Sequence, residues 1–266
     1  MKTLAMAVTL GGLAPWCTAQ TITQCLIEPH QRIELKSPVS AQIVAVHEDR
    51  GAVVRKGQLL VSLDAEVEQS ALASANFRSV MQGQVRSAES RLQNAHEKLK
   101  RREELRKDNF ISAQDRDDAM AEARIAEADL LEARDNRELA KLEAHRLAAV
   151  VSRYALVSPI AGVVTERLQN PGELAQTGDA ATAVIKLAQI DPLRVDLVLP
   201  VARHGAAKLG AVVDVKPEAP FTGSWKATVR VVDKVVDSAS GTFRVRLELP
   251  NPKGEIPAGV KCSAAL

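Results

Sequence analysis

Few residues of this chain have the types and spacing that catalysis or metal binding requires. The chain has five histidines, which are His30, His47, His96, His145 and His204. They are scattered along the sequence, and no two have the close spacing of the ligand pairs that zinc sites need. Copper(I) sites favour clustered sulfur, but Met81 and Met120 are far apart. We therefore expect neither an enzyme nor a bound metal or cofactor.

The N-terminal residues 1–19 have the composition of a signal peptide. Lys2 gives a positive start, Leu4 to Trp16 is a short apolar stretch, and Cys17-Thr18-Ala19 supplies the small residues required before a cleavage site. Cleavage at this point would leave Gln20 first, whereas an uncleaved segment would act as an anchor. Both outcomes fit the sequence, and both predict that the chain is exported.

The two other cysteines, Cys25 and Cys262, are candidates for a disulfide. Both lie in apolar segments that we expect to be strands, and an exported protein reaches an oxidising compartment. We expect one bridge between them, with two unpaired buried thiols as the alternative. In the chain-entropy account, closing so long a loop stabilises the fold by on the order of 4 to 5 kcal/mol.

The main organising feature of the chain is one motif that occurs twice. The matching pairs, all at one constant offset, are Ser37-Pro38 with Ser158-Pro159, Gly51 with Gly172, and Gly57 with Gly178. Each copy alternates apolar residues, reaches a glycine turn and continues as a β-branched run to a second glycine, which predicts strand, turn, strand. We expect the four glycines to form structural turns. Neither copy could close a core alone, so residues 36–64 and 155–189 should form one split β-domain.

Residues 65–154, between the two copies, read as two long helices. They contain no proline and one glycine, and they are rich in good helix formers. The apolar positions expected in the first helix are Phe77, Met81, Val85, Ala88, Leu92, Ala95 and Leu99. Those in the second are Ala119, Ala123, Ala126, Leu130, Ala133, Ala140, Ala144 and Leu147, with Arg137 as the one polar intruder. This spacing predicts an antiparallel coiled coil, with arms of about 42 residues that span roughly 60 Å.

The turn of this hairpin is predicted near residues 108–112. Asp108-Asn109 interrupts the first helix, and Ser112 is suited to cap the second, with Asp115 at the position where a carboxylate meets free backbone N–H groups. Phe110 and Ile111 would then lie at the exposed tip. Such apolar residues either bind a partner or close the turn themselves.

With these motifs in this order, the chain resembles the periplasmic adaptor subunits of tripartite efflux and secretion systems, also called membrane fusion proteins, of the HlyD and RND type. The resemblance rests on the split repeat (SPVSAQIVAV with GAVVRKGQLL, and SPIAGVV with NPGELAQTG), the inserted hairpin, and a third segment, IDPLRVDLVLP followed by GTFRVRLELPNPKGEIPAGVKC. It implies an elongated α+β fold: a split lipoyl-like β-domain (a barrel-sandwich hybrid), an inserted antiparallel coiled-coil hairpin and a small β-barrel.

The resemblance also implies domain boundaries. Residues 1–19 would be the signal peptide, 20–35 an N-terminal strand that joins the β-barrel, 36–64 and 155–189 the two lipoyl-like halves, 65–154 the hairpin, and 190–266 the barrel. Family members often carry a further membrane-proximal domain after the barrel. This sequence stops just beyond the last expected barrel strand, so transporter contacts are expected on the barrel.

By the same resemblance, the protein would work in the periplasm as an adaptor and associate with the inner membrane through a transporter. It would link that transporter to a TolC-like outer-membrane channel, and the resemblance favours an RND transporter over an ABC transporter. It would act as a homo-oligomer, which the resemblance implies is a hexamer. The family's channel-docking signature fits Arg101, Leu105 and Ser112. Leu105 would fill an apolar groove, Arg101 would meet a carboxylate or carbonyl, and the Ser112 hydroxyl would bond to backbone.

Nucleic acid is not an expected partner. The formal net charge is +2, 3% of residues are aromatic, and basic residues alternate with acidic ones along the predicted helices. Surfaces that bind single strands instead interleave basic with aromatic residues.

Two alternatives remain beside the adaptor. A biotinyl or lipoyl carrier would present a modified lysine on the tight turn between the halves, but the hairpin replaces that turn, and Lys56 and Lys186 lack the flanking residues of a carrier lysine. A plain structural coiled-coil protein of the periplasm would leave the split repeat unexplained.

Overall fold

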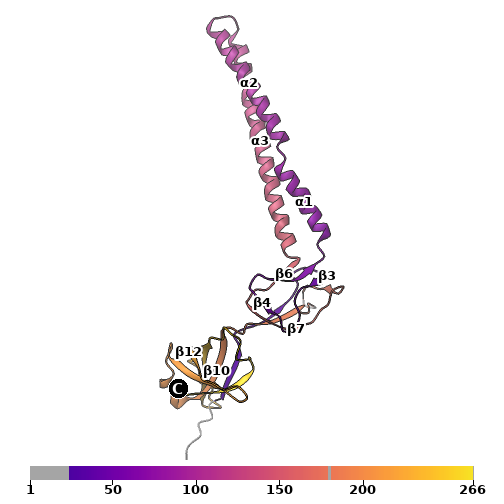
Figure 1. The fold of residues 1–266 in the computed structure, drawn as a ribbon. Helices are drawn as coiled ribbons and strands as arrows, with labels where there is room; N and C mark the ends of the chain where they lie inside the picture. The colour runs from indigo at the N-terminus through magenta and orange to yellow at the C-terminus, as the bar shows by residue number, and fades with distance from the viewer. Residues whose placement is uncertain (1–23, 179–180, 266) are drawn as a thin grey trace, which may run out of the picture. The chain divides into compact units, whose positions relative to one another are not determined.

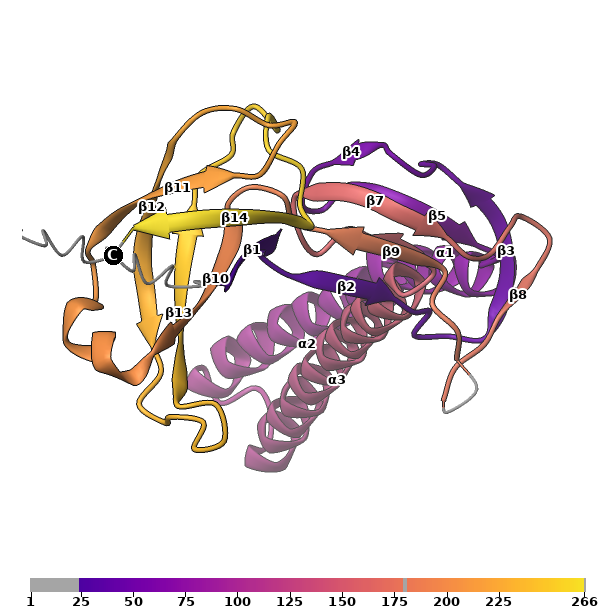
Figure 2. The same ribbon diagram turned by 90° about the horizontal axis from the view of Figure 1, so that it is seen from below.

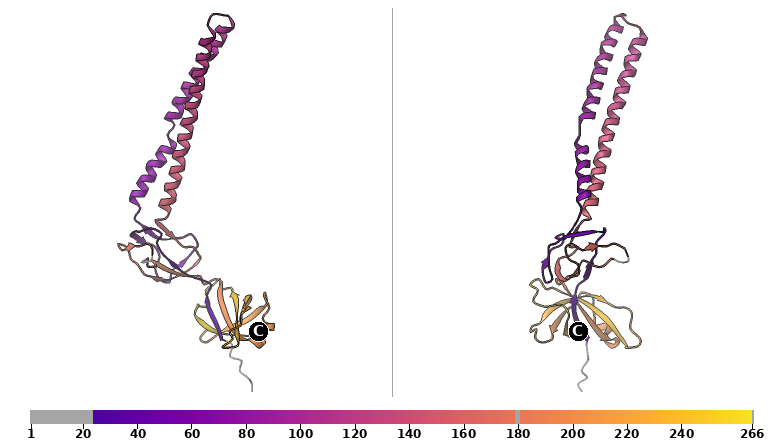
Figure 3. Two further views of the ribbon diagram at one scale, coloured as in Figure 1. Left: turned by 180° about the vertical axis from the view of Figure 1, so that it is seen from behind. Right: turned by 90° about the vertical axis from the view of Figure 1, so that its right-hand side faces the viewer.

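The computed structural model describes residues 24–178 and 181–265, which divide into two compact units. One unit contains the described residues up to His30 and those from Ile190 onward, and the other runs from Gln31 to Gln189. The expected α+β class is confirmed, with a β-barrel in the first unit and a split β-domain with a helical hairpin in the second (Figures 1 and 3). The predicted signal peptide lies outside the described residues. In 24–178 and 181–265, no helix is long and apolar enough to cross a membrane.

The barrel closes through six antiparallel strands (Figure 2). In order around the barrel they are β1 (Gln24–Pro29), β10 (Leu193–Pro200), β13 (Thr242–Leu249), β12 (Trp225–Val232), β11 (Val212–Pro217) and β14 (Val260–Ala265), and a 3₁₀ helix, η1 (Val201–Ala206), follows β10. Every second residue of β10 is buried, from Leu193 to Leu199, as a sheet with one apolar face requires. Closure leaves the barrel without an open sheet edge.

A buried asparagine fixes the loop that follows β13. Asn251 is 5% exposed, and its side-chain amide donates to the carbonyls of Ile190 and Ile256, at 3.1 and 2.9 Å. Its side-chain carbonyl accepts from the backbone N–H of Ile256 at 3.2 Å. The amide thus satisfies backbone groups that burial would otherwise leave unpaired, at a position where a β-branched or apolar residue could not.

A disulfide joins the first and last barrel strands. Cys25 of β1 lies directly opposite Cys262 of β14 in the strand register, their Cα atoms are 4.8 Å apart, and the two sulfur atoms are bonded. Both residues belong to the barrel core, at 6% and 5% exposure. The bond therefore ties together the two strands at which the barrel closes.

The split β-domain interlocks the two sequence repeats. One of its sheets has the order β2 (Arg32–Leu35), β9 (Ile185–Ala188), β7 (Gly162–Arg167), β4 (Val53–Val54). The other has the order β6 (Ala155–Val157), β5 (Leu59–Leu63), β3 (Ala41–Val46), β8 (Leu174–Ala175). First-half strands β3, β4 and β5 pair with second-half strands β8, β7 and β6, so both halves complete each sheet, as the sequence predicted.

The hydrogen bonds of the two halves mirror each other. The Gly51 N–H donates to the Val164 carbonyl at 2.8 Å, and the Gly172 N–H donates to the matching Ile43 carbonyl at 2.8 Å. The Ser37 and Ser158 hydroxyls each donate to the carbonyl two residues on, at 2.5 and 2.6 Å. The repeat in the sequence is therefore a repeat of backbone geometry.

We expect Gly172→Val to destabilise the split β-domain by on the order of 1 to 3 kcal/mol, because Gly172 has a φ of +92°, where side chains are strained. Its counterpart Gly51 has a φ of +89°, and neither site has atoms near an added Cβ, so the strain comes from the backbone alone. Thermal unfolding by circular dichroism measures the effect. Gly83→Ala, at a glycine with open space and no left-handed φ, is the control and should not destabilise. Unchanged unfolding of Gly172→Val would contradict the equivalence of the two turns.

Residues 20–35 were predicted to form one strand that joins the barrel, but the described part of this range forms two strands. Gln24–Pro29 joins the barrel, but Arg32–Leu35 forms β2 and pairs with β9 of the split β-domain. The reason is packing, since Ile33 and Leu35 lie against the core of that domain.

The hairpin consists of α1 (Glu66–Val80), α2 (Gly83–Lys107) and α3 (Ala113–Ser152). As predicted, α2 and α3 pack through Val85, Ala88, Ala95, Ala123, Ala126 and Leu130, all at most 9% exposed. Ion pairs cross this interface between Lys98 and Glu122 at 2.6 Å and between Arg134 and Glu89 at 3.2 Å. Exposed pairs of this kind stabilise little, so the apolar seam holds the arms together.

The first arm contains two helices, and the prediction of a single helix there is wrong. At Met81 the backbone is extended, with φ −61° and ψ 128°, and α2 begins at Gly83, a residue of low helix propensity. The break shifts the helical phase, so that α1 packs through Ala75 while Phe77 and Met81 are 68% and 54% exposed. The spacing had predicted that Phe77 and Met81 lie in the seam, and this prediction is wrong.

Candidate docking site at the hairpin tip

The end of α2 is fixed by backbone hydrogen bonds that bring Leu105 and Phe110 together. The Asn109 N–H donates to the Arg106 carbonyl at 3.1 Å, and the Phe110 N–H donates to the Leu105 carbonyl at 2.9 Å. Asn109 has a φ of 59°, the left-handed conformation that asparagine tolerates better than most residues. This is a Schellman motif, in which residues equivalent to Leu105 and Phe110 commonly make an apolar contact.

Ser112 begins α3, as predicted. The Asp115 N–H donates to the Ser112 Oγ at 3.1 Å, and the Ser112 N–H donates to the Asp115 Oδ2 at 3.1 Å, which together form a capping box. The Ser112 hydroxyl also donates to the Asp115 Oδ2 at 2.6 Å. Hydrogen bonds from the Ser112 side chain and backbone lower the pKa of Asp115 from its ordinary value.

These bonds change the expected role of Ser112. Its single proton is already donated to Asp115, so the hydroxyl has no donor left for a partner's backbone. It positions the tip by fixing where α3 starts.

The exposed apolar part of the tip is Leu105 and Phe110. Leu105 is 41% exposed and Phe110 is 76% exposed, whereas Ile111 is partly buried. Most of the Phe110 side chain is therefore uncovered, and its binding to a partner stays a prediction. With Leu105 it offers apolar surface that only another molecule could cover.

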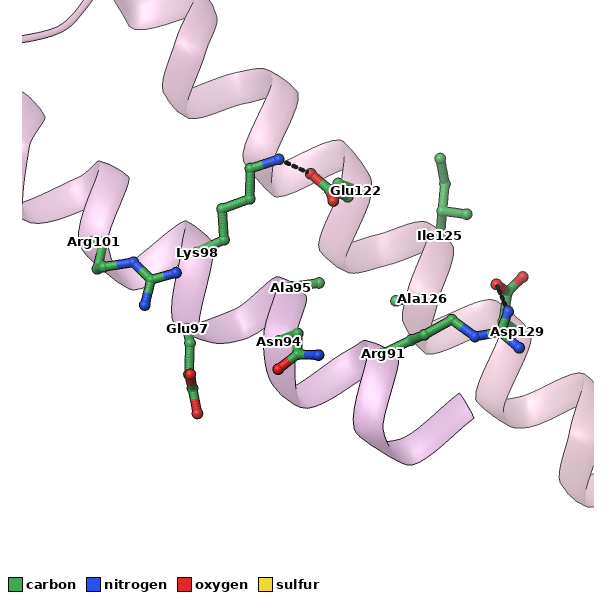
Figure 4. A pocket seen from close by; sticks show the side chains of 10 residues that line it. All are labelled: Arg91, Asn94, Ala95, Glu97, Lys98, Arg101, Glu122, Ile125, Ala126 and Asp129. Atoms are coloured by element: carbon green, nitrogen blue, oxygen red, sulfur yellow. Dashed lines mark hydrogen bonds and ion pairs between the residues drawn. The ribbon is translucent and has the colours of Figure 1, made fainter. Parts of the chain in front are cut away.

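Arg101 lies one turn below Leu105 along α2, at a groove between α2 and α3 (Figure 4). In this groove, Lys98 pairs with Glu122 and Arg91 pairs with Asp129, at 2.6 and 3.8 Å. Arg101 makes no hydrogen bond or ion pair with any residue in the described ranges. Its guanidinium is therefore available to a carboxylate or carbonyl, which it can bind through two parallel N–H groups.

The structure places the predicted site residues in three separate regions. Arg101, Leu105, Phe110, Ile111 and Ser112 are at or next to the tip, the four glycines form turns of the split β-domain, and the cysteines close the barrel. Sequence reasoning missed the specific role of Asn109. An asparagine directly after a helical run that ends in lysine and aspartate is the signal that could have revealed it.

We expect Ser112→Ala to fray the first turn of α3 and to raise the pKa of Asp115 toward its ordinary value, because both effects depend on the Ser112 Oγ. A carboxylate with a lowered pKa stabilises the fold above its unfolded pKa, and that contribution is lost as the pH falls through the folded pKa. The alanine variant should therefore lose this acid sensitivity at the tip. An NMR titration of Asp115 measures it, with Ser112→Thr as the control that keeps a cap. If the pKa of Asp115 is the same in Ser112→Ala as in the parent chain, the Ser112 hydroxyl is not what lowers it.

The described residues contain no group of three or more histidine, cysteine or acidic side chains that could hold a metal ion. Of the two lysines considered for a carrier, Lys186 pairs with Glu166 at 3.0 Å, and this contact raises its pKa. The connection from β5 to β6, where a carrier lysine would lie, is the hairpin.

Comparisons with known proteins agree with this architecture. Residues 78–145 match the domain described as "RND MFP, alpha-helical hairpin domain", and residues 195–266 match "CusB-like, beta-barrel domain". Multidrug resistance protein MdtE of Escherichia coli (strain K12) is 27% identical over 249 residues, which are 89% of this chain and 61% of MdtE. Multidrug export protein AcrE of the same strain is 27% identical over 239 residues, 85% of this chain and 58% of AcrE. The chain thus spans less than two thirds of the length of these relatives.

The fold is also found in a solved structure. The crystal structure of MacA from Actinobacillus actinomycetemcomitans superimposes with a TM-score of 0.74 at 19% identity, covering 91% of this chain and 76% of that one. Both domain matches fall on elements that the structure contains, the hairpin and the closed barrel. The chain belongs to the membrane fusion proteins, with a hairpin domain of the RND type and a CusB-like barrel.

Proposed function

We propose that this protein is a periplasmic adaptor that links an inner-membrane efflux transporter to a TolC-like outer-membrane channel. The observation that carries the proposal is the hairpin tip, where exposed Leu105 and Phe110 adjoin an arginine without a partner in the described chain. Relatives named as multidrug resistance and multidrug export proteins support an export role. The RND-type hairpin supports an RND transporter over an ABC transporter as the inner-membrane partner.

The tip would bind the channel by burying apolar surface around one charged contact. Fully burying a leucine or phenylalanine side chain contributes roughly 1.5 to 3 kcal/mol, and each 1.4 kcal/mol changes an affinity about tenfold. Arg101, one helical turn from Leu105, would bind a carboxylate or carbonyl of the channel and so fix how the tip lies on it. Such a contact is small, so several copies acting together would strengthen it.

The adaptor would act as a homo-oligomer, six copies in the family's assembly, that encloses a sealed conduit. The barrel would contact the transporter, and this contact would hold the protein at the inner membrane. The hairpin would extend toward the channel.

Site-specific photo-crosslinking in cells tests the proposal. A photoreactive residue at Phe110 should capture an outer-membrane channel, identified by mass spectrometry. The same residue at Val67 is a matched control, because Val67 is 77% exposed and Phe110 is 76% exposed, but Val67 lies at the other end of the hairpin. Capture of a channel from both positions, or from neither, would refute docking through the tip. The transporter that co-purifies from cross-linked envelopes identifies the system as RND or ABC.

A further inference from the structure

A groove of about 420 Å³ lies between the arms beside the break between α1 and α2, which Figure 3 shows next to the continuous α3. Two arginines line it, Arg78 from the first arm and Arg137 from α3, together with apolar side chains such as Met81 and Ala140. Among the described residues that line this groove, none is acidic. The groove therefore combines apolar surface with two positive charges.

Farther along the hairpin, the cations between the arms are paired. Arg91 of α2 meets Asp129 of α3 at 3.8 Å, and Lys98 of α2 meets Glu122 of α3 at 2.6 Å. Beside the break this pattern stops, because both arms supply a cation there and neither supplies a carboxylate to the groove. An anion from outside the chain would balance the two charges.

Arg137 carries a polar group that the chain leaves unpaired. Its Nε is buried and has no hydrogen-bond acceptor among the described residues. The neighbouring carboxylate of Glu138 does not serve as one, because it pairs with Lys141 at 2.8 Å. A buried N–H without an acceptor is unfavourable, so a ligand that offers an acceptor to this guanidinium is favoured.

Arg78 has no hydrogen bond or ion pair from its side chain within the described chain. The carboxylate that interacts with it electrostatically is Glu143, both oxygens of which accept from Arg146 at 2.8 Å. Arg78 lies in the last turn of α1, where the helix dipole favours a positive charge. That effect accounts for a cation at Arg78, but not for Arg137, which is far from either end of α3.

The start of α2 adds to the positive field at the groove. Its N-cap residue, Gln82, makes no capping hydrogen bond with its side chain, and its first turn contains no acidic residue. The first N–H groups of a helix have no partner within the helix and attract anions. Gln84 and Val85 of this first turn line the groove.

We propose that this groove binds a small amphipathic anion, of which a medium-chain carboxylate is the simplest example. The carboxylate binds between Arg78 and Arg137, and the apolar chain lies against Met81, Val85 and Ala140. Because Arg78 belongs to α1 and Arg137 to α3, the ligand joins the two arms at the point where the first arm is discontinuous. It therefore stabilises the hairpin against unfolding. The site is separate from the tip and requires neither a channel nor a transporter.

Titration calorimetry with octanoate tests the proposal on the full chain. Octan-1-ol, which has the same chain length and no charge, is the matched probe. Octanoate should bind saturably, and octan-1-ol should bind at least about ten times more weakly, because it cannot form charge-assisted hydrogen bonds with the arginines. Absence of saturable octanoate binding, or equal affinity for both probes, would overturn the proposal.

A variant that fills the anion position from within the chain gives a second test. Gln84→Glu places a carboxylate at the groove, in the first turn of α2, where acidic residues favour the helix, so the chain should fold. The new carboxylate should raise the dissociation constant of octanoate by at least about tenfold. Gln114→Glu is the matched control, because Gln114 is likewise exposed and is likewise the second residue of its helix, α3. Equal losses in the two variants, or no loss in Gln84→Glu, would contradict the assigned site.

The role of Arg137 can be measured directly by NMR. Octanoate should shift the signal of the Arg137 Nε–H group, and Arg137→Gln should raise the dissociation constant by at least about tenfold, since a charge-assisted hydrogen bond is lost. Arg124→Gln is the control, because Arg124 is exposed on α3 about 20 Å from Arg137. An unmoved Arg137 signal at saturating octanoate, or unchanged affinity in a folded Arg137→Gln, would refute binding in this groove.

Discussion

Replacing Leu105 with aspartate should abolish capture of the outer-membrane channel while leaving the protein folded. Leu105 is 41% exposed at the end of α2, so the free protein tolerates a carboxylate there. In the docked state, however, the carboxylate would enter an apolar groove without a partner, which costs several kcal/mol. Because each 1.4 kcal/mol is a tenfold change, affinity for the channel should fall by roughly a hundredfold or more.

Channel pull-down and restoration of export in a deletion strain measure this effect. Leu131→Asp is the control, since that leucine is also exposed, at 61%, but lies away from the tip on α3. Arg101→Asp should also weaken capture, because it removes the free guanidinium and introduces the opposite charge. All three variants should keep the circular dichroism spectrum of the parent chain. Full export and unaltered channel capture by Leu105→Asp would mean that the tip is not the docking site.

Removing the disulfide should strongly destabilise the barrel. Cys25 and Cys262 are 237 positions apart in sequence, and their bond connects the two strands that close the barrel. In the chain-entropy account, releasing so long a loop costs on the order of 4 to 5 kcal/mol, a large share of the stability of a small domain. We therefore expect Cys25→Ser to lower the melting temperature of the barrel markedly.

The hairpin provides an internal reference for this experiment. It contributes nearly all of the helical signal and shares no core with the barrel, so its helicity should persist after the barrel of Cys25→Ser has unfolded. Reducing agent should lower the stability of the parent chain to that of Cys25→Ser, and should have no further effect on the variant. Recovery of both residues as free thiols from oxidised protein would contradict the prediction.

The sequence predicted those features that depend on a few neighbouring residues. The matched glycines indicated the repeat because a backbone with φ near +90° strongly favours glycine wherever it occurs. Ser112 indicated the start of α3 because its bonds reach only as far as Asp115. The order of the motifs along the chain was enough for the fold class through the family resemblance that this order carries.

The tertiary structure alone decided the features that depend on distant partners. Spacing placed Phe77 and Met81 in the seam of the first arm, but spacing cannot reveal a shift of helical phase at Met81, which depends on how α1 packs against α3. Arg32–Leu35 could have extended either sheet, and the core around Ile33 and Leu35 determined which.

The same distinction holds at the tip. The sequence by itself located the turn and the capping residue Ser112, because helix ends are encoded by local capping. Arg101 and Leu105 were indicated only by the resemblance to the family's docking signature. Only the folded hairpin determined that the Ser112 hydroxyl donates its hydrogen bond to Asp115, that Arg101 has no partner in the described chain, and that Phe110 remains exposed. Each of these depends on which groups approach a side chain in space, and a linear sequence does not specify that.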